Sequence, residues 1–204
     1  MKLNKFKNRE NGFTLMETLI SMAVFTLIVG VLTLFARNVW VYNAFLSGGL
    51  ANADAGRQIL KSAVAEIRTA STADTGAYTI SQATASLFTF YSNIDSDILK
   101  EKIRYYVTGT TLYKGVTKPT GSPLTYNPAN EKISTLATNL TSNSVFSYYN
   151  KNYEGNNAAL AFPVNVAEIR LIKITMTLDQ DPNRPPLPRT FTTQVSIRNL
   201  KDNL

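Results

Sequence analysis

Residues 9–35 read RENGFTLMETLISMAVFTLIVGVLTLF, an apolar run that follows a short basic stretch and contains a carboxylate. From Phe13 to Phe35 the only charged side chain is that of Glu17, and there is no proline. As an α-helix this run would be about 35 Å long, enough to cross a hydrocarbon core of about 30 Å. Charged residues inside membrane spans are rare and usually functional, so Glu17 needs an explanation beyond anchoring.

The basic residues ahead of this run set its expected orientation. The formal net charge of the chain is +7, and Lys2, Lys5, Lys7 and Arg9 all precede the apolar segment. Because positive residues tend to remain on the cytoplasmic side of a membrane, we expect a cytoplasmic N-terminus and an extracytoplasmic remainder. A cleaved secretory signal fits poorly, since the apolar stretch is too long and no small-residue cleavage site follows it.

The chain contains neither cysteine nor histidine. This excludes disulfides, thiolate metal sites and cysteine nucleophiles, and it removes the commonest general base and metal ligand. The sequence also lacks a P-loop, a dinucleotide-binding fingerprint and a nucleophile elbow. No basic run or basic helix face follows residue 12, so we expect no nucleic-acid partner. We therefore expect no enzymatic activity, no cofactor and no metal.

Helix-compatible sequence continues beyond the apolar run. Between residues 46 and 67, apolar or small residues recur at three- and four-residue steps, with charged residues at other positions. We predict one helix over 14–71, bendable near Gly30 and around 48–49. Two helices that break at this glycine pair are the alternative. The stripe consists of Leu46, Leu50, Ala53, Leu60, Val64 and Ile67.

The N-terminal stretch resembles the class III signal of type IV prepilins and type II secretion pseudopilins. A short basic leader, the string G-F-T-L-x-E and an uninterrupted apolar helix occur in that order. The resemblance implies that a prepilin peptidase cleaves between Gly12 and Phe13 and methylates the new amine of Phe13. It also implies that the apolar helix is a membrane anchor before assembly and the packing core of a filament afterwards.

The same resemblance gives Glu17 a role in assembly. Glu17 would meet the N-terminal amine of a neighbouring subunit. A buried carboxylate that is paired with a cation becomes tolerable, and it specifies register because a mispaired subunit is penalised. The alternative is that Glu17 lies near the helix end and reaches the membrane interface.

From residue 72 onward, short β-favouring runs alternate with polar stretches. A hairpin is expected at Thr108-Gly109-Thr110, and a change of alternation at 171–172 predicts a β-bulge or a change of face. A long helix followed by antiparallel strands predicts an α+β fold, which is also the pilin-like arrangement. The expected strands are 77–80, 87–91, 102–107, 111–116, 145–149, 164–178 and 190–199.

The sequence thus divides into a leader (1–12), a membrane and filament-core helix (13–36), an amphipathic continuation (37–71) and a β-rich head (72–204). The strings IRYYVTGTTLYKG, VFSYYN and VSIRNL resemble J-type pseudopilins and W-type minor pilins. That resemblance implies assembly near a filament tip with other minor pilins and the major subunit. It also implies contact with the prepilin peptidase, the inner-membrane assembly platform and membrane lipid. Another minor pilin, a major subunit, and a single-pass adhesion module that never polymerises are the alternatives.

Two polar motifs in the head are candidates for a metal site and for a modification site. Asp179, Asp181 and Asn183 form D-x-D-x-N, which could begin an oxygen-rich Ca²⁺ loop. Pro182 interrupts this motif, and neither Gly nor Glu follows at EF-hand spacing, so we expect a turn with solvated acids. Asn139 begins a formal glycosylation sequon, to which we give little weight.

Two further groups of residues in the head, a pair of aspartates and a set of tyrosines, have structural roles as the favoured interpretation. Asp95 and Asp97 are expected to be loop acids or helix-cap residues before ILKEKI. The tyrosines of the head could form an exposed patch for a partner, but their alternating strand positions favour half-buried core. These tyrosines are Tyr105, Tyr106, Tyr113, Tyr148 and Tyr149.

Overall fold

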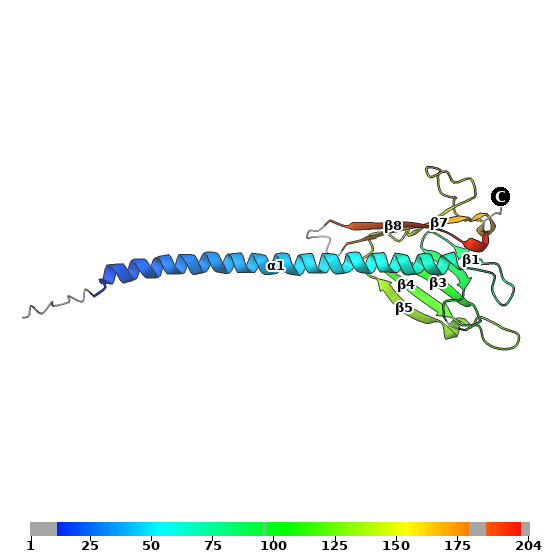
Figure 1. Ribbon diagram of the computed structural model, residues 1–204, viewed down its shortest axis with the longest axis horizontal. Coiled ribbons are helices and arrows are strands. Elements are labelled where there is room, and N and C mark those ends of the chain that lie inside the picture. The colour runs from blue at the N-terminus through cyan, green and yellow to red at the C-terminus, as the bar shows by residue number, and fades with distance from the viewer. Residues whose placement is uncertain (1–11, 96, 180–186, 201–204) are drawn as a thin grey trace, which may run out of the picture. The chain divides into compact units, whose positions relative to one another are not determined.

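A computed structural model describes residues 12–95, 97–179 and 187–200 of the chain (Figure 1). The chain divides into two compact units, Met1–Gly48 and Gly49–Leu204. The predicted α+β class is confirmed: a long N-terminal apolar helix precedes antiparallel sheets, a pilin-like arrangement.

Helix α1 runs from Leu15 to Arg68. Its backbone remains helical through residues 48–49, so the alternative with two helices is wrong. The presence of glycine at position 56 is explained by packing, because an added Cβ at Gly56 would lie 3.0 Å from the ring of Phe191. A glycine here weakens the helix by about 1 kcal/mol relative to alanine, but it lets an aromatic side chain approach the helix backbone.

The head contains two antiparallel sheets. The first has five strands in sequential order, which are β1 (Ile80–Ala83), β2 (Leu87–Ser92), β3 (Glu101–Thr108), β4 (Thr111–Thr117) and β5 (Lys132–Ala137). The second has the order β6 (Phe146–Tyr149), β7 (Leu171–Leu178) and β8 (Arg189–Ser196). Three short 3₁₀ turns, at Pro128–Asn130, Val166–Glu168 and Arg198–Leu200, complete the described elements.

Several sequence predictions about the strands are confirmed. Residues 109–110 close the β3–β4 hairpin, in which Thr108 pairs with Thr111. Strands β7 and β8 pair in continuous register from Leu171–Ser196 to Leu178–Arg189. The strand expected at 77–80 is displaced toward the C-terminus, because β1 begins at Ile80.

Two expectations were wrong. Residues 164–170 are not strand: a 3₁₀ turn at Val166–Glu168 is capped by Asn165, whose Oδ1 accepts a 3.1 Å hydrogen bond from Ala167 N. The change of alternation at 171–172 therefore marks the start of β7 and not a β-bulge. Strand β5 was not expected at all, because most of its side chains are exposed and its sequence lacks an alternating apolar face.

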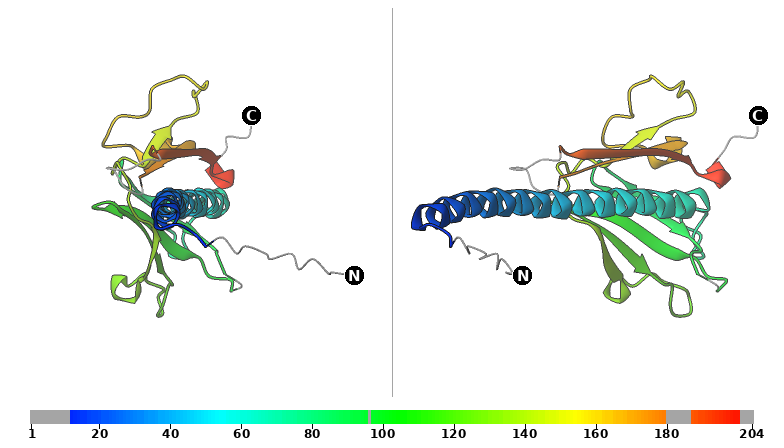
Figure 2. Two further views of the ribbon diagram at one scale, coloured as in Figure 1. Left: turned by 90° about the vertical axis from the view of Figure 1, so that its left-hand side faces the viewer. Right: turned by 60° about the vertical axis from the view of Figure 1, so that its left-hand side comes forward.

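The core of the head lies where the second half of α1 meets both sheets. Figures 1 and 2 show the five-stranded sheet on one side of this half of α1 and the three-stranded sheet on the other. Phe88 on β2 lies within ring-contact distance of Phe146 and Tyr148 on β6, with centroids 6.0 and 5.7 Å apart. The helix contributes its buried face, which includes Leu60, Ala63 and Ile67. Burial of this apolar stripe stabilises the contact by about 25 cal/mol per Å².

Candidate processing and assembly site

The predicted cleavage position lies just before the first turn of α1. Gly12, Phe13 and Thr14 have no regular secondary structure, and the side chain of Phe13 is 81 % exposed. An added Cβ at Gly12 would meet no other atom within 4 Å. Exposed, non-helical backbone is the form that proteases cleave most readily. The bond between residues 12 and 13 is therefore accessible.

Thr14 and Glu17 form a reciprocal cap at the start of α1. The backbone N–H of Glu17 donates to Thr14 Oγ1, and the backbone N–H of Thr14 donates to Glu17 Oε2, both at 3.3 Å. The Thr14 hydroxyl also lies 3.3 Å from Glu17 Oε2 as a donor. This T-x-x-E capping box satisfies two of the backbone donors that a helix start leaves unpaired. A carboxylate in the first turn is further stabilised by the helix dipole.

The capping box was missed by the sequence analysis, although its signal is readable in T-L-M-E. Glu17 therefore has a role in the single chain as well as the role that the motif suggests. Among the described residues, Thr14 donates both of its hydrogen bonds to Oε2 of this carboxylate, and Glu17 is exposed. The carboxylate retains the capacity to accept a hydrogen bond from a cation beside it.

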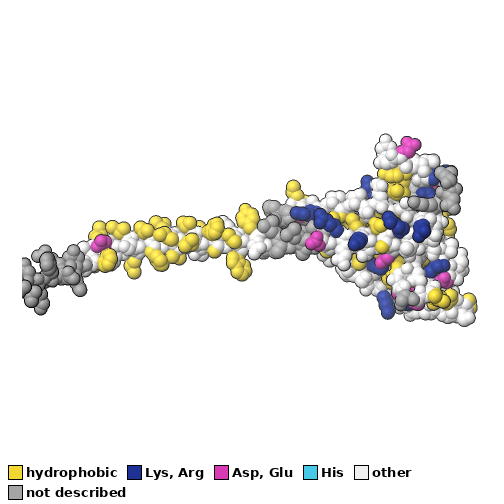
Figure 3. All heavy atoms as spheres, in the orientation of Figure 1, with side chains coloured by type: hydrophobic (Ala, Val, Ile, Leu, Met, Phe, Trp, Pro, Cys, Tyr) yellow, Lys and Arg dark blue, Asp and Glu magenta, His cyan; other side chains and the backbone are white. Residues whose placement is uncertain are grey.

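The helix beyond the cap is apolar on every side. Leu15–Asn43 is long and apolar enough to cross a membrane by length and composition, and its most apolar window is not buried in the chain. Hydrophobic side chains predominate on the face of the N-terminal part of α1 that is seen in Figure 3, and exposed apolar residues follow one another along the helix from Leu15 to Tyr42. A helix that is hydrophobic all round needs a lipid or protein environment.

Three threonine hydroxyls within this apolar segment are satisfied inside the helix. The hydroxyls of Thr18, Thr26 and Thr33 each donate to a backbone carbonyl three or four residues earlier, at 2.8, 2.8 and 2.7 Å. Satisfied hydroxyls are compatible with hydrocarbon, where an unpaired donor is costly. Trp40 and Tyr42, both exposed, lie near the end of the segment, where amphipathic rings favour the membrane interface.

A polar network joins α1 to the five-stranded sheet. Tyr105 on β3 donates a 2.7 Å hydrogen bond to Glu66 Oε2, and Lys114 Nζ on β4 lies 2.6 Å from Glu66 Oε1. Burial, together with the nearby Glu66 charge, raises the pKa of the Tyr105 hydroxyl. The network lines a groove with residues from α1, β3, β4 and β5, among them Gln58 and Ser134. It fixes the position of the second half of the helix on the sheet.

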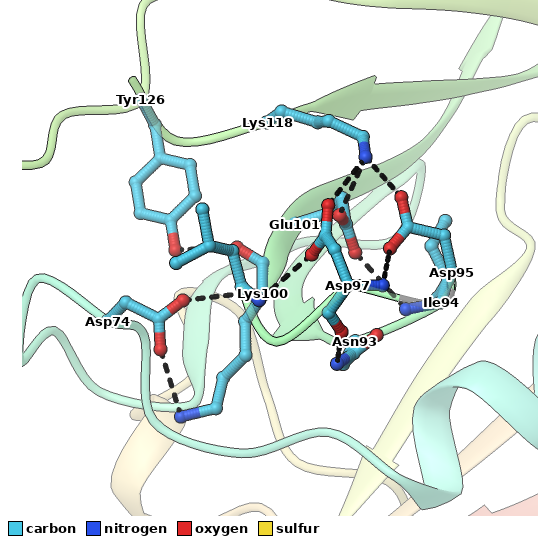
Figure 4. A network of polar contacts seen from close by, with 10 residues as sticks. Asp74, Asn93, Ile94, Asp95, Asp97, Lys100, Glu101, Lys118 and Tyr126 are labelled. Atoms are coloured by element: carbon cyan, nitrogen blue, oxygen red, sulfur yellow. Dashed lines mark hydrogen bonds and ion pairs between the residues drawn. The ribbon is translucent and has the colours of Figure 1, made fainter. Parts of the chain in front are cut away.

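A second network lies at the connection from β2 to β3 (Figure 4). Asp95 and Asp97 are loop acids: Asp95 Oδ1 accepts from Asp97 N at 3.0 Å, and Asp97 Oδ1 accepts from Leu99 N at 2.9 Å. Strand β3 begins at Glu101, so the helix-cap alternative for these residues is wrong. The ammonium of Lys118 binds both aspartates, and its hydrogen bond lowers the pKa of Asp95.

The five tyrosines lie on different strands. Tyr105 and Tyr106 are neighbours on β3 and Tyr113 lies on β4, whereas Tyr148 and Tyr149 belong to β6 in the three-stranded sheet. Tyr105, Tyr148 and Tyr149 are buried, which confirms the core interpretation for them. Tyr106 and Tyr113 are half-buried and stack across the β3–β4 pair, with ring centroids 5.3 Å apart. We find no single patch of these five side chains on the part of the chain that the structure describes.

The two polar motifs of the head have different outcomes. Asn139 is exposed and adopts a φ of 60°, and its carbonyl accepts a 2.9 Å hydrogen bond from Asp179 N. Asp181 and Asn183 lie outside the described residues, so the D-x-D-x-N motif stays untested as a turn.

Comparison with known families identifies the N-terminal motif. Residues 7–33 match the family described as the prokaryotic N-terminal methylation motif. No curated protein sequence matches the chain. The matched segment contains Gly12, Phe13, the capping box and most of the apolar run. The chain therefore carries a prokaryotic N-terminal methylation motif of the type IV prepilin-like kind.

Proposed function

We propose that this chain is a minor pilin or pseudopilin, a structural subunit that acts by assembly. A prepilin peptidase cleaves between Gly12 and Phe13 and methylates the amine of Phe13. The observation that carries this proposal is the capped apolar helix that begins two residues after an exposed, non-helical Gly12–Phe13 bond. That arrangement lies within the segment that matches the methylation motif.

Glu17 connects the membrane-bound and assembled states in this proposal. Before assembly its carboxylate caps the helix through Thr14. In the filament it also faces the amine of a neighbouring subunit, whose positive charge offsets the cost of enclosing a carboxylate among apolar helices. A subunit in the wrong register would leave that charge unpaired, which is strongly unfavourable. The pair therefore selects one axial position for each incoming subunit.

The finer assignment rests on sequence resemblance. The β-rich head, with its tyrosine-containing hairpin, fits a J-type pseudopilin or W-type minor pilin that joins other minor subunits near the filament tip and primes assembly. Retention of Glu17 suits a subunit with another subunit above it, which argues mildly against the outermost position. The partners are other minor pilins, the major subunit, the prepilin peptidase and the inner-membrane assembly platform. Before assembly the chain is a single-pass inner-membrane protein with an extracytoplasmic head.

Glu17→Gln tests this function. Glutamine at the same position can still cap the helix, because capping boxes use Glu or Gln, but it carries no charge. We expect Glu17→Gln to insert into the membrane normally and to be absent from sheared filaments or tip complexes, as judged by immunoblotting. Glu10→Gln is the matched control, because Glu10 lies in the leader that cleavage removes.

Membrane insertion is measured separately in the same variants. Trp40 is the only tryptophan of the chain, so its fluorescence reports one position. In vesicles, brominated lipids should quench Trp40 equally in the unaltered chain and in Glu17→Gln. If Glu17→Gln enters filaments as efficiently as the Glu10→Gln control, the proposed role of the carboxylate is wrong. If both are excluded equally, the defect does not come from Glu17.

A further inference from the structure

Three carboxylates converge between the β2–β3 loop and the start of β3. Oxygen atoms of Asp95, Asp97 and Glu101 all lie within 4.8 Å of one another. Lys118, which follows β4, reaches into this group: its Nζ binds Asp95 Oδ2, lies 2.8 Å from Asp97 Oδ2 and lies 3.8 Å from Glu101 Oε1. Figure 4 shows all four side chains pointing toward one another. Three carboxylates and one ammonium leave an excess of negative charge.

Glu101 is the unusual member of this group. The residue is fully buried, and its Oε2 accepts a 3.1 Å hydrogen bond from the backbone N–H of Ile94. Its Oε1, the oxygen that faces Lys118, accepts no hydrogen bond from the described residues. Burial raises the pKa of Glu101, and the negative charges of Asp95 and Asp97 raise it further. A buried carboxylate oxygen without a hydrogen-bond donor is costly unless a cation lies against it.

We propose that Asp95, Asp97 and Glu101 form a Ca²⁺ site, in which the ion displaces the ammonium of Lys118. Ca²⁺ prefers carboxylate oxygens at about 2.4 Å, so two ligands of one ion can be at most about 4.8 Å apart. The three oxygens satisfy this condition. The ion would lie directly against Glu101 Oε1, which has Lys118 Nζ only at 3.8 Å and accepts no hydrogen bond from the described residues, and water completes its coordination shell.

The choice of Ca²⁺ follows from the ligands. All three are carboxylates, and the chain has no histidine or cysteine to favour zinc. Mg²⁺ demands near-octahedral geometry and shorter bonds, to which oxygens this far apart adapt less easily than to Ca²⁺. The proposal does not depend on the assembly function, since the site lies wholly within the head.

Lys118 can leave the site without disturbing the core. Its side chain is 52 % exposed, whereas that of Glu101 is 1 % exposed. The ammonium can therefore move to solvent while the buried ligand stays in place. Ca²⁺ would then join the loop that carries Asp95 and Asp97 to the first residue of β3, and binding would compete with the internal cation.

Equilibrium dialysis with radioactive Ca²⁺ tests the site on the full-length chain in detergent micelles. We expect one Ca²⁺ to bind per chain. Lys118→Met should bind about tenfold or more tightly than the unaltered chain, because the competing ammonium is gone. Asp97→Asn, on the exposed loop, should bind about tenfold or more weakly. Glu168→Gln is the control, since Glu168 is an exposed acid on the separate Val166–Glu168 turn.

Each other result overturns the proposal. If neither the unaltered chain nor Lys118→Met binds Ca²⁺ at millimolar concentration, the carboxylates are not a site. If only Lys118→Met binds, the lysine fills the site permanently in the natural protein. If Glu168→Gln weakens binding as much as Asp97→Asn, the ion is held by surface charge in general. Near-ultraviolet circular dichroism of each variant verifies that the head remains folded.

Discussion

Tyr105 on β3 donates a 2.7 Å hydrogen bond to Glu66 on α1, which places a polar contact at the junction of helix and sheet. Lys114 binds the other oxygen of the same carboxylate at 2.6 Å. The side chains of Lys114 and Glu66 are only 16 % and 17 % exposed, so the pair is largely shielded from water. An apolar stripe alone would allow the helix to slide or rotate, whereas this three-residue contact specifies one position.

Removal of Lys114 should destabilise the head more than removal of the Tyr105 hydroxyl. Lys114→Met leaves a mostly buried carboxylate without its cation, at a cost of about 2–4 kcal/mol. Tyr105→Phe removes one hydrogen bond to a charged group, at a cost of about 1–2 kcal/mol. Urea unfolding of the chain in detergent, followed by circular dichroism, measures both free energies. Equal or negligible losses would show that the ion pair does not specify the helix position.

Gly115 on β4 is expected to resist substitution because of Glu131. An added Cβ would overlap Glu131 Oε1 and lie 2.6 Å from its Cδ. Glu131 holds Arg104 through two hydrogen bonds, of which the one from Nε to Oε1 is 2.8 Å. Gly115→Ala should therefore displace the carboxylate and lower the free energy of unfolding by about 1 kcal/mol. In a Glu131→Ala background the same substitution should cost much less, and an undiminished cost would contradict this explanation.

The head should lose stability at alkaline pH. Burial raises the pKa of Tyr105 and of Tyr148, and it raises the pKa of Tyr126 to about 12. Above the usual tyrosine pKa of about 10, the unfolded chain releases these protons while the folded chain keeps them. Stability is therefore unaffected below about pH 10 and falls above it, by about 1.4 kcal/mol per pH unit for each fully buried hydroxyl.

Urea unfolding at a series of pH values from 8 to about 12 measures this loss. Absorbance at the phenolate wavelength should show that the buried hydroxyls ionise only as the head unfolds. Tyr148→Phe should make the fall in stability with pH less steep. A steepness unchanged in Tyr148→Phe would assign the alkaline loss to other groups.

The sequence predicted the helix and most of the strands because their signals are local. The apolar run and the stripe that ends at Ile67 determined a helix whose observed end is Arg68. Strand β5 was not predicted, because this exposed edge strand has no alternating apolar pattern in its sequence. The strand prediction for 164–170 was wrong because the apolar residues of this run alternate as in a strand, whereas the side chain of Asn165 caps a 3₁₀ turn there.

The candidate site was predictable only in part, for the same physical reason. Gly12, Phe13 and Glu17 stand in a contiguous motif, and Thr14 could have been recognised as the first residue of a capping box. The approach of Lys118 to Glu101 depends instead on how β3 and β4 pair and where their connecting segments turn. Contacts between distant segments of this kind leave no spacing signal in one sequence.

The mass of the mature N-terminus tests the central claim most directly. The chain should be expressed with its cognate prepilin peptidase, purified from membranes and sheared filaments, and digested for mass spectrometry. We expect an N-terminal peptide that begins with N-methylated Phe13 and no peptide from residues 1–12. Replacement of Gly12 by a bulkier residue should leave the leader attached. A mature chain that retains Met1, or that is cleaved elsewhere than between Gly12 and Phe13, would contradict the account.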